Sequence, residues 1–283
     1  MRDRRFFELS ALFDHSLYLH SSQAHFDHVA ADYLNQVAAT PHMCAALDWQ
    51  ITALEELFRS RLKHMRNERI IRIADFGAGA GAVSSWPALQ ALLRVTGISS
   101  GPTPAIELTL LDASEQMKWV TRELSIDACP ESLIKRFAND FSRILDLVRQ
   151  ARYRDHDIAS EDAQLTRRLR APQHIIICSF VMHHLSLQGK LSALRLLRSA
   201  LRDDGFLILV DEYRTHDDHL RYLDELVRVR RRTAKEIPYG LESFVDHSWY
   251  IEAFRESGIE LRVLTAMPQT GATLGYIIAR HHA

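Results

Sequence analysis

A short apolar run that leads directly into three alternating glycines constrains this chain more than any other feature. The run over residues 70–74 continues into the segment Asp75-Phe76-Gly77-Ala78-Gly79-Ala80-Gly81. Glycine adopts positive φ at little cost and carries no Cβ, so such a loop lets a ligand approach the backbone closely. A helix expected over about residues 83–95 would add free N–H groups and the positive end of its dipole. The segment therefore predicts a strand–loop–helix unit with a ligand-binding turn.

The rest of the chain alternates apolar runs with helical patterns. Besides the first, expected strands cover residues 106–112, 133–138, 174–179, 206–211, 260–266 and 273–279, of which 133–138 has the weakest pattern. Strands that alternate with helices form parallel sheets. The last two strands are too close in sequence for a helical crossover, so they should pair antiparallel. We expect an α/β, doubly wound, Rossmann-like fold whose seven-stranded sheet is mostly parallel, with an antiparallel last strand.

The first 66 residues carry a helical pattern instead, with apolar side chains at helical spacing between Trp49 and Leu62. We expect residues 1–66 to form a helical lid or extension, and residues 67–283 to form the main domain. That domain carries two expanded stretches, at about 142–172 and 214–245. The N-terminal helices could cover a ligand, form a homodimer contact, or do both, and the sequence favours none of these.

Composition excludes several classes of protein. The net charge is −1, so no overall basic field would attract nucleic acid. The spacing of the three cysteines matches neither a metal motif nor a disulfide framework. The N-terminus lacks a signal peptide's apolar stretch, and no run reaches the ~18 apolar residues of a membrane span. We expect a cytoplasmic protein without a membrane segment or a bound metal.

Several segments, in their order along the chain, resemble the class I S-adenosylmethionine-dependent methyltransferases over roughly residues 24–280. Residues 75–81 resemble the first motif of that family, and residues 110–114 resemble its second, in which Asp112 would hold the ribose. The glycine spacing G-x-G-x-G also differs from the G-x-G-x-x-G of dinucleotide folds. The resemblance implies S-adenosyl-L-methionine as the cofactor, bound at the carboxyl ends of the strands.

Three further segments carry the same resemblance. Residues 139–141 resemble the segment that contacts the adenine, and residues 177–185, which end in His-His-Leu, resemble a motif of small-molecule members. Residues 25–33 resemble the N-terminal helix that covers the cofactor. The cofactor-binding residues that the resemblance implies are Tyr33, Asp75, Gly77, Ala78, Gly79, Gly81, Asp112, Ala113, Met117, Asn139, Asp140, Phe141, Ser179 and Phe180.

The chemistry of the acceptor side depends on polar residues that follow the later strands. Methyl transfer is an in-line displacement, and an acceptor hydroxyl or ammonium must lose a proton to a base. His183 and His184 follow one strand, and Asp211-Glu212-Tyr213 ends the next. His183, His184 and Glu212 are the catalytic candidates, although the histidines could simply pack or bind cofactor. The arginines of a helix expected over 216–235 could bind an anionic substrate group or form a solvated face.

We therefore expect a methyltransferase that acts on O or N of a small-molecule acceptor, with a role in specialised metabolism. Two alternatives stay open. One is an enzyme that modifies tRNA or other RNA, supported only by the arginine-rich helix and the stretch over 142–172. The other is a cofactor-binding partner protein without activity. A nicotinamide oxidoreductase is opposed by the glycine spacing.

Overall fold

The chain folds into an α/β structure, described here from a computed structural model for residues 26–27, 29–66, 68–97, 104–156, 158, 169, 171–213, 245, 247–269 and 272–281. The helices are η1 (Ala30–Asp32), α3 (Tyr33–Ala39), α4 (Pro41–Arg66), α5 (Ser85–Gly97), α6 (Glu115–Arg122), α7 (Glu131–Phe137), η2 (Ala138–Asp140), α8 (Phe141–Gln150), η3 (Met182–His184), α10 (Leu187–Ala200) and α12 (His247–Glu256). The strands are β1 (Ile70–Phe76), β2 (Ala105–Asp112), β3 (Arg152–Asp155), β4 (Gln173–Ser179), β5 (Leu201–Tyr213), β6 (Ile259–Gln269) and β7 (Ala272–His281). The predicted α/β class is confirmed.

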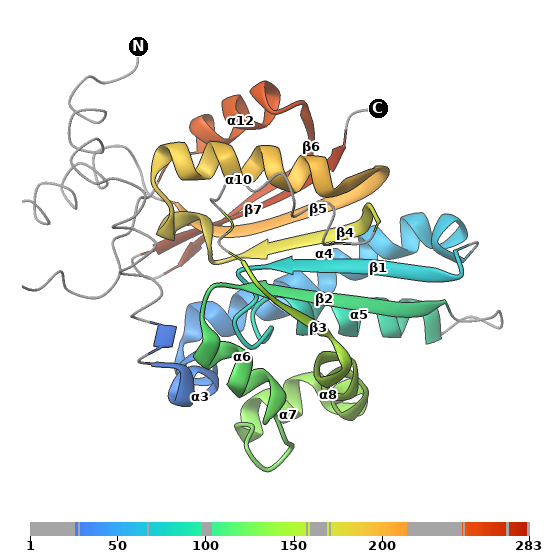
Figure 1. The fold of residues 1–283 in the computed structure, drawn as a ribbon, viewed down its shortest axis with the longest axis vertical. Helices are drawn as coiled ribbons and strands as arrows, with labels where there is room; N and C mark the ends of the chain where they lie inside the picture. Colours follow the sequence, from blue (N-terminus) through green and yellow to red (C-terminus); the bar gives the residue numbers. More distant parts are fainter. Residues whose placement is uncertain are drawn as a thin grey trace, which may run out of the picture.

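The strands form a single sheet in the order β3-β2-β1-β4-β5-β7-β6 (Figure 1). Strands β1 to β5 pair parallel, and β7 pairs antiparallel with both β5 and β6. From β1 the chain first adds β2 and β3 on one side, and then β4 and β5 on the other. Ligands of open α/β sheets bind outside the carboxyl ends of the strands at such a reversal of order. The ends of β1 and β4 therefore mark the expected site.

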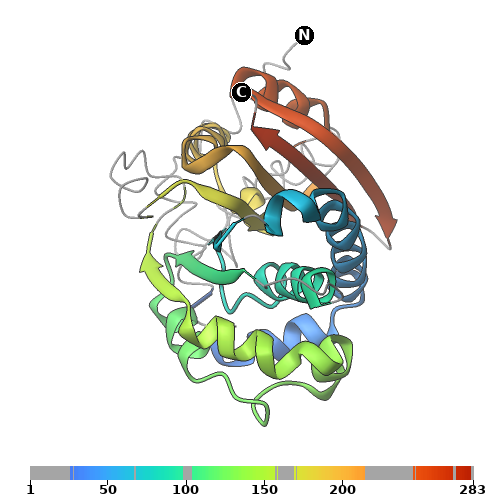
Figure 2. The ribbon, with the colours of Figure 1, turned by 90° about the vertical axis from the view of Figure 1, so that its right-hand side faces the viewer.

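Alternate residues of the central strands pack on opposite faces of the sheet, as the period of a strand requires. Ile175 and Ile177 of β4 belong to a core shared with α4, α5 and α8. Ile176 and Cys178 of the same strand belong to a second core, shared with α10 and α12. Helices consequently cover both faces (Figure 2). Both faces of β4 being buried explains its unbroken apolar run.

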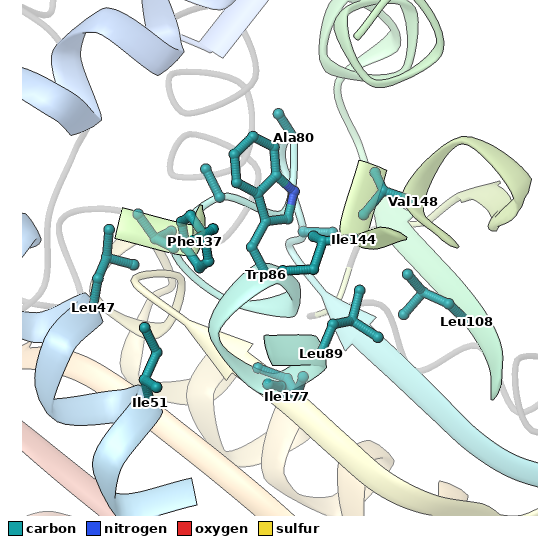
Figure 3. Packing of buried hydrophobic residues seen from close by; sticks show 14 of the residues in the cluster. Leu47, Ile51, Ala80, Trp86, Leu89, Leu108, Phe137, Ile144, Val148 and Ile177 are labelled. Carbon is teal, nitrogen blue, oxygen red and sulfur yellow. The ribbon is translucent and has the colours of Figure 1, made fainter. Parts of the chain in front are cut away.

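The helix α4 is part of the first core rather than a separate appendage. Its residues Leu47 and Ile51 are buried in the same cluster as Trp86 of α5 and Phe137 of α7 (Figure 3). The amide Nε2 of Gln50, also on α4, donates a 3.2 Å hydrogen bond to the carbonyl of Val83. The N-terminal helices thereby contact the loop that begins α5.

The weak strand expected over 133–138 is wrong, because this stretch forms helix α7. Leu133 and Phe137 are both buried, and their four-residue spacing places them on one helical face. Glu131 pairs with Lys135 at 2.7 Å across one turn. The third strand of the sheet is β3, whose sequence Arg-Tyr-Arg-Asp is short and polar. Among the described strands it pairs with β2 alone, at an edge of the sheet, so it needs no apolar run.

The two expanded stretches are described only in part. The first half of 142–172 supplies α8 and β3, which are elements of the fold rather than an insertion. Residues 159–168 and 214–244, including the whole of the predicted arginine-rich helix, lie outside the described residues. Within the part that is described, no helix is long and apolar enough to cross a membrane.

Candidate functional site

The glycine loop lies where the strand order reverses, at the end of β1. Gly77, Gly79 and Gly81 all have positive φ, at +67°, +52° and +78°. The N–H of Gly77 donates a 2.7 Å hydrogen bond to the carbonyl of Leu111, which ties the loop to β2. A Cβ on Gly77 would lie 2.3 Å from Cγ2 of Val181, in the loop after β4. Glycine is needed at position 77 both for the backbone and for close packing.

Asp112, at the end of β2, faces the same loop. Its Oδ2 accepts a hydrogen bond from the N–H of Gly79 at 2.7 Å, and its Oδ1 accepts one from the N–H of Ser114 at 2.8 Å. Burial raises the pKa of the Asp112 carboxyl, against the opposing effect of these two N–H donors. A carboxylate has about four lone-pair sites, so two backbone bonds leave acceptor capacity for ligand hydroxyl groups.

Asp75 is fully buried beneath the loop. Its Oδ2 accepts hydrogen bonds from the hydroxyls of Ser84, at 2.6 Å, and of Ser85. Burial raises the pKa of Asp75 to about 7, although the two hydroxyls oppose that shift. Its Oδ1 has no hydrogen-bond partner among the described residues. A buried carboxylate oxygen without a partner is costly, so this atom is a candidate contact for a ligand donor.

The segment before α3 contacts two of the loops at this edge of the sheet. The ring of Phe26 meets the ring of His184 edge-on, with centroids 5.2 Å apart. The Oδ1 of Asp27 accepts a 2.6 Å hydrogen bond from the hydroxyl of Ser114. The start of the described chain is therefore joined to the loop after β4 and to the loop after β2.

Tyr33, the first residue of α3, covers the glycine loop itself. Its ring lies against Gly79: a Cβ there would be 3.6 Å from the phenolic oxygen. Burial, followed by the charges of Asp112 and Asp75, raises the pKa of the Tyr33 hydroxyl. The phenol therefore stays protonated near neutral pH, and it can donate a hydrogen bond.

The end of β4 carries strained backbone and an unsatisfied hydroxyl. Ser179 is buried, and its Oγ has no hydrogen-bond partner among the residues described. The next residue, Phe180, has a φ of +57°, and its N–H donates a 2.7 Å bond to the carbonyl of Val210. Left-handed backbone at a non-glycine residue costs on the order of 1–3 kcal/mol and is concentrated at functional sites. Both features support the sequence-based assignment of this strand end to the site.

The two histidines lie on the turn η3 but differ in their surroundings. His183 is buried; its N–H donates a 2.9 Å hydrogen bond to Oδ2 of Asp211, and its ring Nδ1 contacts Oδ1 of the same carboxylate. His184 is half-buried, and its ring centroid lies 4.0 Å from that of His183. The hydroxyl of Tyr250, on α12, also reaches Oδ2 of Asp211, at 3.3 Å. The structure thus places a buried carboxylate directly behind His183.

The predicted adenine-contacting segment, residues 139–141, follows helix α7 instead of a strand. Asp140 is 3.8 Å from Nε of Arg94, in the last turn of α5, at the opposite end of that helix from the glycine loop. Asn139 is exposed in the adjacent turn, and Phe141 is a core residue against Trp86, with ring centroids 5.7 Å apart. Helix α7, not a strand, precedes Asn139 and Asp140, so their contact with the adenine stays a prediction from the sequence.

The position expected for that segment belongs to the residue after β3. His156 is buried there, and its N–H donates a 3.1 Å hydrogen bond to the carbonyl of Asp112. Its ring lies edge-on to Phe76, with centroids 6.2 Å apart. Nothing in the polar sequence around β3 identified this residue, since the strand itself has no apolar pattern.

The other predicted site residues divide into three groups. Ala78, in the loop, is buried and donates to the Leu111 carbonyl at 3.1 Å, and Ala113 is half-buried beside Asp112. Met117 is fully buried in the first core. Glu212 is a backbone member of β5, but its side chain is outside the described part of the structure.

One buried lysine near the histidine turn, Lys190, was not identified from the sequence. Lys190, on α10, is fully buried, and its Nζ donates 2.6 Å hydrogen bonds to the carbonyls of Met182 and Leu185. Its spacing with Leu194 and Leu197 places it on the apolar stripe of α10, which is the signal that could have identified it. Among the described residues, no group of three or more His, Cys, Asp or Glu could hold a metal.

Comparison with known proteins gives a result only at the level of structure. No protein-family model matches the chain, and no curated protein matches it. Among solved structures, a 1,6-didemethyltoxoflavin N1-methyltransferase of Burkholderia thailandensis, with bound S-adenosylhomocysteine, is similar at a TM-score of 0.54 and 12% identity, over 96% of this chain and 92% of that one. The chain therefore shares its fold with that protein.

A second methyltransferase agrees with this result. The magnesium protoporphyrin IX methyltransferase of Synechocystis PCC 6803, solved with S-adenosylhomocysteine, has a TM-score of 0.50 and 12% identity. The match covers 92% of this chain and 97% of that one. The likeness extends over nearly the whole length of both proteins.

Proposed function

We propose that the protein is an S-adenosylmethionine-dependent methyltransferase acting on O or N of a small-molecule acceptor. The observation that carries the proposal is the bond between the Gly79 N–H and Oδ2 of Asp112, 2.7 Å long. It joins the glycine loop to an acid at the end of the neighbouring strand, where the strand order reverses. Two similar folds that were solved with S-adenosylhomocysteine add support.

The residues at this edge fit an amino-acid nucleoside. Asp112 would accept hydrogen bonds from the ribose hydroxyls, and Tyr33 would cover the methionine end. The oxygens Oδ1 of Asp75 and Oγ of Ser179, which have no hydrogen-bond partner among the described residues, would be available to polar groups of the ligand. Gly77, Gly79, Gly81 and Ala78 would leave the backbone accessible. The cofactor would supply a methyl group on a sulfonium, ready for displacement.

The chain's own residues would position the acceptor and take its proton. His183 is the stronger candidate for a general base, because a carboxylate behind an imidazole fixes its tautomer. His184 packs against Phe26, and it would line the same space. Phe180, strained and mostly buried, would contact the bound molecules. Glu212 stays a candidate on sequence grounds alone.

The acceptor is proposed to be a small molecule. The described part of the structure shows no membrane-spanning helix, and the net charge of −1 disfavours nucleic acid as a partner. The three free cysteines fit a reducing, cytoplasmic setting. A role in specialised metabolism and a homodimer formed through the N-terminal helices are predictions that rest on the sequence.

The test is production of S-adenosylhomocysteine from S-adenosylmethionine with a panel of phenols, heteroaromatic N–H compounds and carboxylic acids, and with bulk tRNA. Turnover on a small acceptor that is lost in His183→Gln supports the proposal. Turnover on tRNA alone would replace the small-molecule assignment by an RNA-modifying activity. Binding without turnover on any acceptor would favour a non-catalytic cofactor-binding protein.

A further inference from the structure

The turn that carries His183 and His184 is held from both ends by buried charged groups. On one side Asp211 accepts the His183 N–H and contacts its ring Nδ1. On the other side the amino group Nζ of Lys190 donates to the carbonyls of Met182 and Leu185, which bracket the two histidines. All three charged or ionisable partners in this arrangement, Lys190, Asp211 and His183, are buried.

A buried lysine is costly, and packing does not explain it. Lys190 is fully buried on the apolar stripe of α10, between the histidine turn and Leu194. An ammonium loses its hydration on burial, and a methionine of similar length would fill the same space without that loss. What the lysine adds is a pair of short hydrogen bonds to two turn carbonyls. The contribution of Lys190 is therefore to hold the backbone of the turn, not to fill the core.

The Asp211 carboxylate accepts at more positions than the amide of an asparagine could. Its Oδ2 accepts from the His183 N–H at 2.9 Å and from the Tyr250 hydroxyl at 3.3 Å, while its Oδ1 contacts the imidazole Nδ1. A carboxylate is an acceptor at both oxygens, so the ring nitrogen that faces it must carry a proton. The other nitrogen, Nε2, then holds the lone pair of a neutral imidazole.

We propose that Asp211 and Lys190 are positioning residues for methyl transfer, which hold the histidine turn so that His183 keeps its proton on Nδ1 and its lone pair on Nε2. This proposal deepens the proposed function and rests on it. The acceptor oxygen or nitrogen forms its bond to the methyl carbon with its own lone pair, and the bonding pair of the broken C–S bond stays on sulfur. Nε2 of His183 takes the proton that the acceptor loses.

The experiment reads the tautomer of His183 directly, without an acceptor. The full-length protein is labelled with ring-¹⁵N histidine, and long-range ¹H–¹⁵N spectra are recorded at pH 8 with and without S-adenosylhomocysteine. The spectrum of His183→Gln assigns the signal by its absence. We expect a neutral ring protonated at Nδ1. A ring protonated at Nε2, or at both nitrogens, would overturn the proposal, even if neither Asp211→Asn nor Lys190→Met folds.

Asp211→Asn and Lys190→Met then test the two positioning residues, with Lys118→Met as the matched control. Lys118 is on α6 and pairs with the exposed Glu115 at 3.0 Å. An asparagine has one acceptor oxygen for contacts that occupy two, so His183 should change to the Nε2–H tautomer or to a mixture. Lys190→Met should broaden the His183 signals or mix the tautomers, and Lys118→Met should leave them unchanged.

The outcomes separate this proposal from the proposed function. If either variant keeps the wild-type His183 signal while remaining folded, that residue has no positioning role. If wild-type protein fails to bind S-adenosylhomocysteine by calorimetry, the proposed function fails, whatever the tautomer. With an acceptor in hand, Asp211→Asn should lower kcat by about 100-fold and leave the KM for S-adenosylmethionine nearly unchanged, as loss of a general base does. An equal loss of kcat in Lys118→Met would show that the effect is not specific to the residues that hold the histidine turn.

Discussion

The N–H of Gly79 lies 2.7 Å from Oδ2 of Asp112, so the loop after β1 is hydrogen-bonded to the end of β2. Three glycines at positive φ make this approach feasible, and the ring of Tyr33 covers it. The same carboxylate also binds the N–H of Ser114, which caps α6. A single acidic side chain thereby fixes the loop and the start of the next helix. Its remaining acceptor sites are those that a ribose would use.

Replacing Gly77 by alanine should destabilise the fold. The new Cβ would lie 2.3 Å from Val181 Cγ2, on backbone at a φ of +67°. Strained backbone and overpacking each cost on the order of 1–3 kcal/mol. We expect Gly77→Ala to lower the free energy of unfolding in urea by about 3 kcal/mol. Gly97→Ala is the control, because no heavy atom of the described residues lies within 4 Å of a Cβ there.

A double mutant separates the two causes. Val181→Ala removes both methyl groups that face Gly77. If the packing explanation holds, Gly77→Ala combined with Val181→Ala should lose less stability than the two single changes added together. If the stability loss of the double mutant equals the sum of the losses of the two single mutants, the positive φ alone makes glycine necessary.

Tyr33 should contribute to ligand binding through its ring. The phenol is buried against Gly79, and its raised pKa keeps it neutral. We expect Tyr33→Ala to weaken binding of S-adenosylhomocysteine by about 10-fold or more, and Tyr33→Phe to weaken it by a smaller factor. Calorimetric titration measures both. Equal affinity of Tyr33→Ala and wild type would remove α3 from the binding site.

Asp75 should make stability fall with rising pH. Burial raises its folded pKa to about 7, whereas an unfolded aspartate titrates near 3.8. Between these values the unfolded chain releases a proton that the folded chain retains, so stability is greatest below pH 4 and is lost toward pH 7. Asp75→Asn should remove this slope. Urea unfolding at pH 5 and pH 7 should therefore show a smaller loss for the variant, and parallel losses would contradict the shift.

Lys190 should have the opposite effect. Burial lowers its folded pKa to about 7, partly opposed by Asp211, from an unfolded value of 10.5. Above pH 7 the unfolded chain keeps a proton that the folded chain has released, so stability rises with pH up to the unfolded pKa. The stability of wild type relative to Lys190→Met should increase by about 1 kcal/mol per pH unit between pH 7 and 8.5. A constant difference would argue against the lowered pKa.

The sequence predicted the parts of this fold in which local pattern and tertiary environment agree. The glycine loop and the buried run of β4 both form where their patterns indicated. The third strand of the sheet formed at a different place in the chain from the one that the apolar pattern predicted. β3 is four residues long, polar and at the edge of the sheet, whereas Leu133 and Phe137 supplied an apolar run that belongs to α7.

Part of the site depends on contacts that no local pattern encodes. The assignment of Asn139 and Asp140 to the adenine assumed a strand just before them, and helix α7 lies there instead. The pairing of His183 with Asp211, 28 residues apart, depends on β4 and β5 being neighbours in the sheet. Lys190 did leave a signal, as a charge on the apolar stripe of α10, and its partners became visible only in three dimensions.

The central claim is that Asp112 and the glycine loop hold S-adenosylmethionine. The direct test is calorimetric titration of S-adenosylhomocysteine, with NAD as the competing nucleotide, into wild type, Asp112→Ala and the exposed-residue control Glu115→Ala. We predict binding of S-adenosylhomocysteine and not of NAD to wild type and to Glu115→Ala. Loss of two charge-assisted hydrogen bonds should weaken binding to Asp112→Ala by about 100-fold. Unchanged affinity in Asp112→Ala, or binding of NAD in preference, would contradict the account.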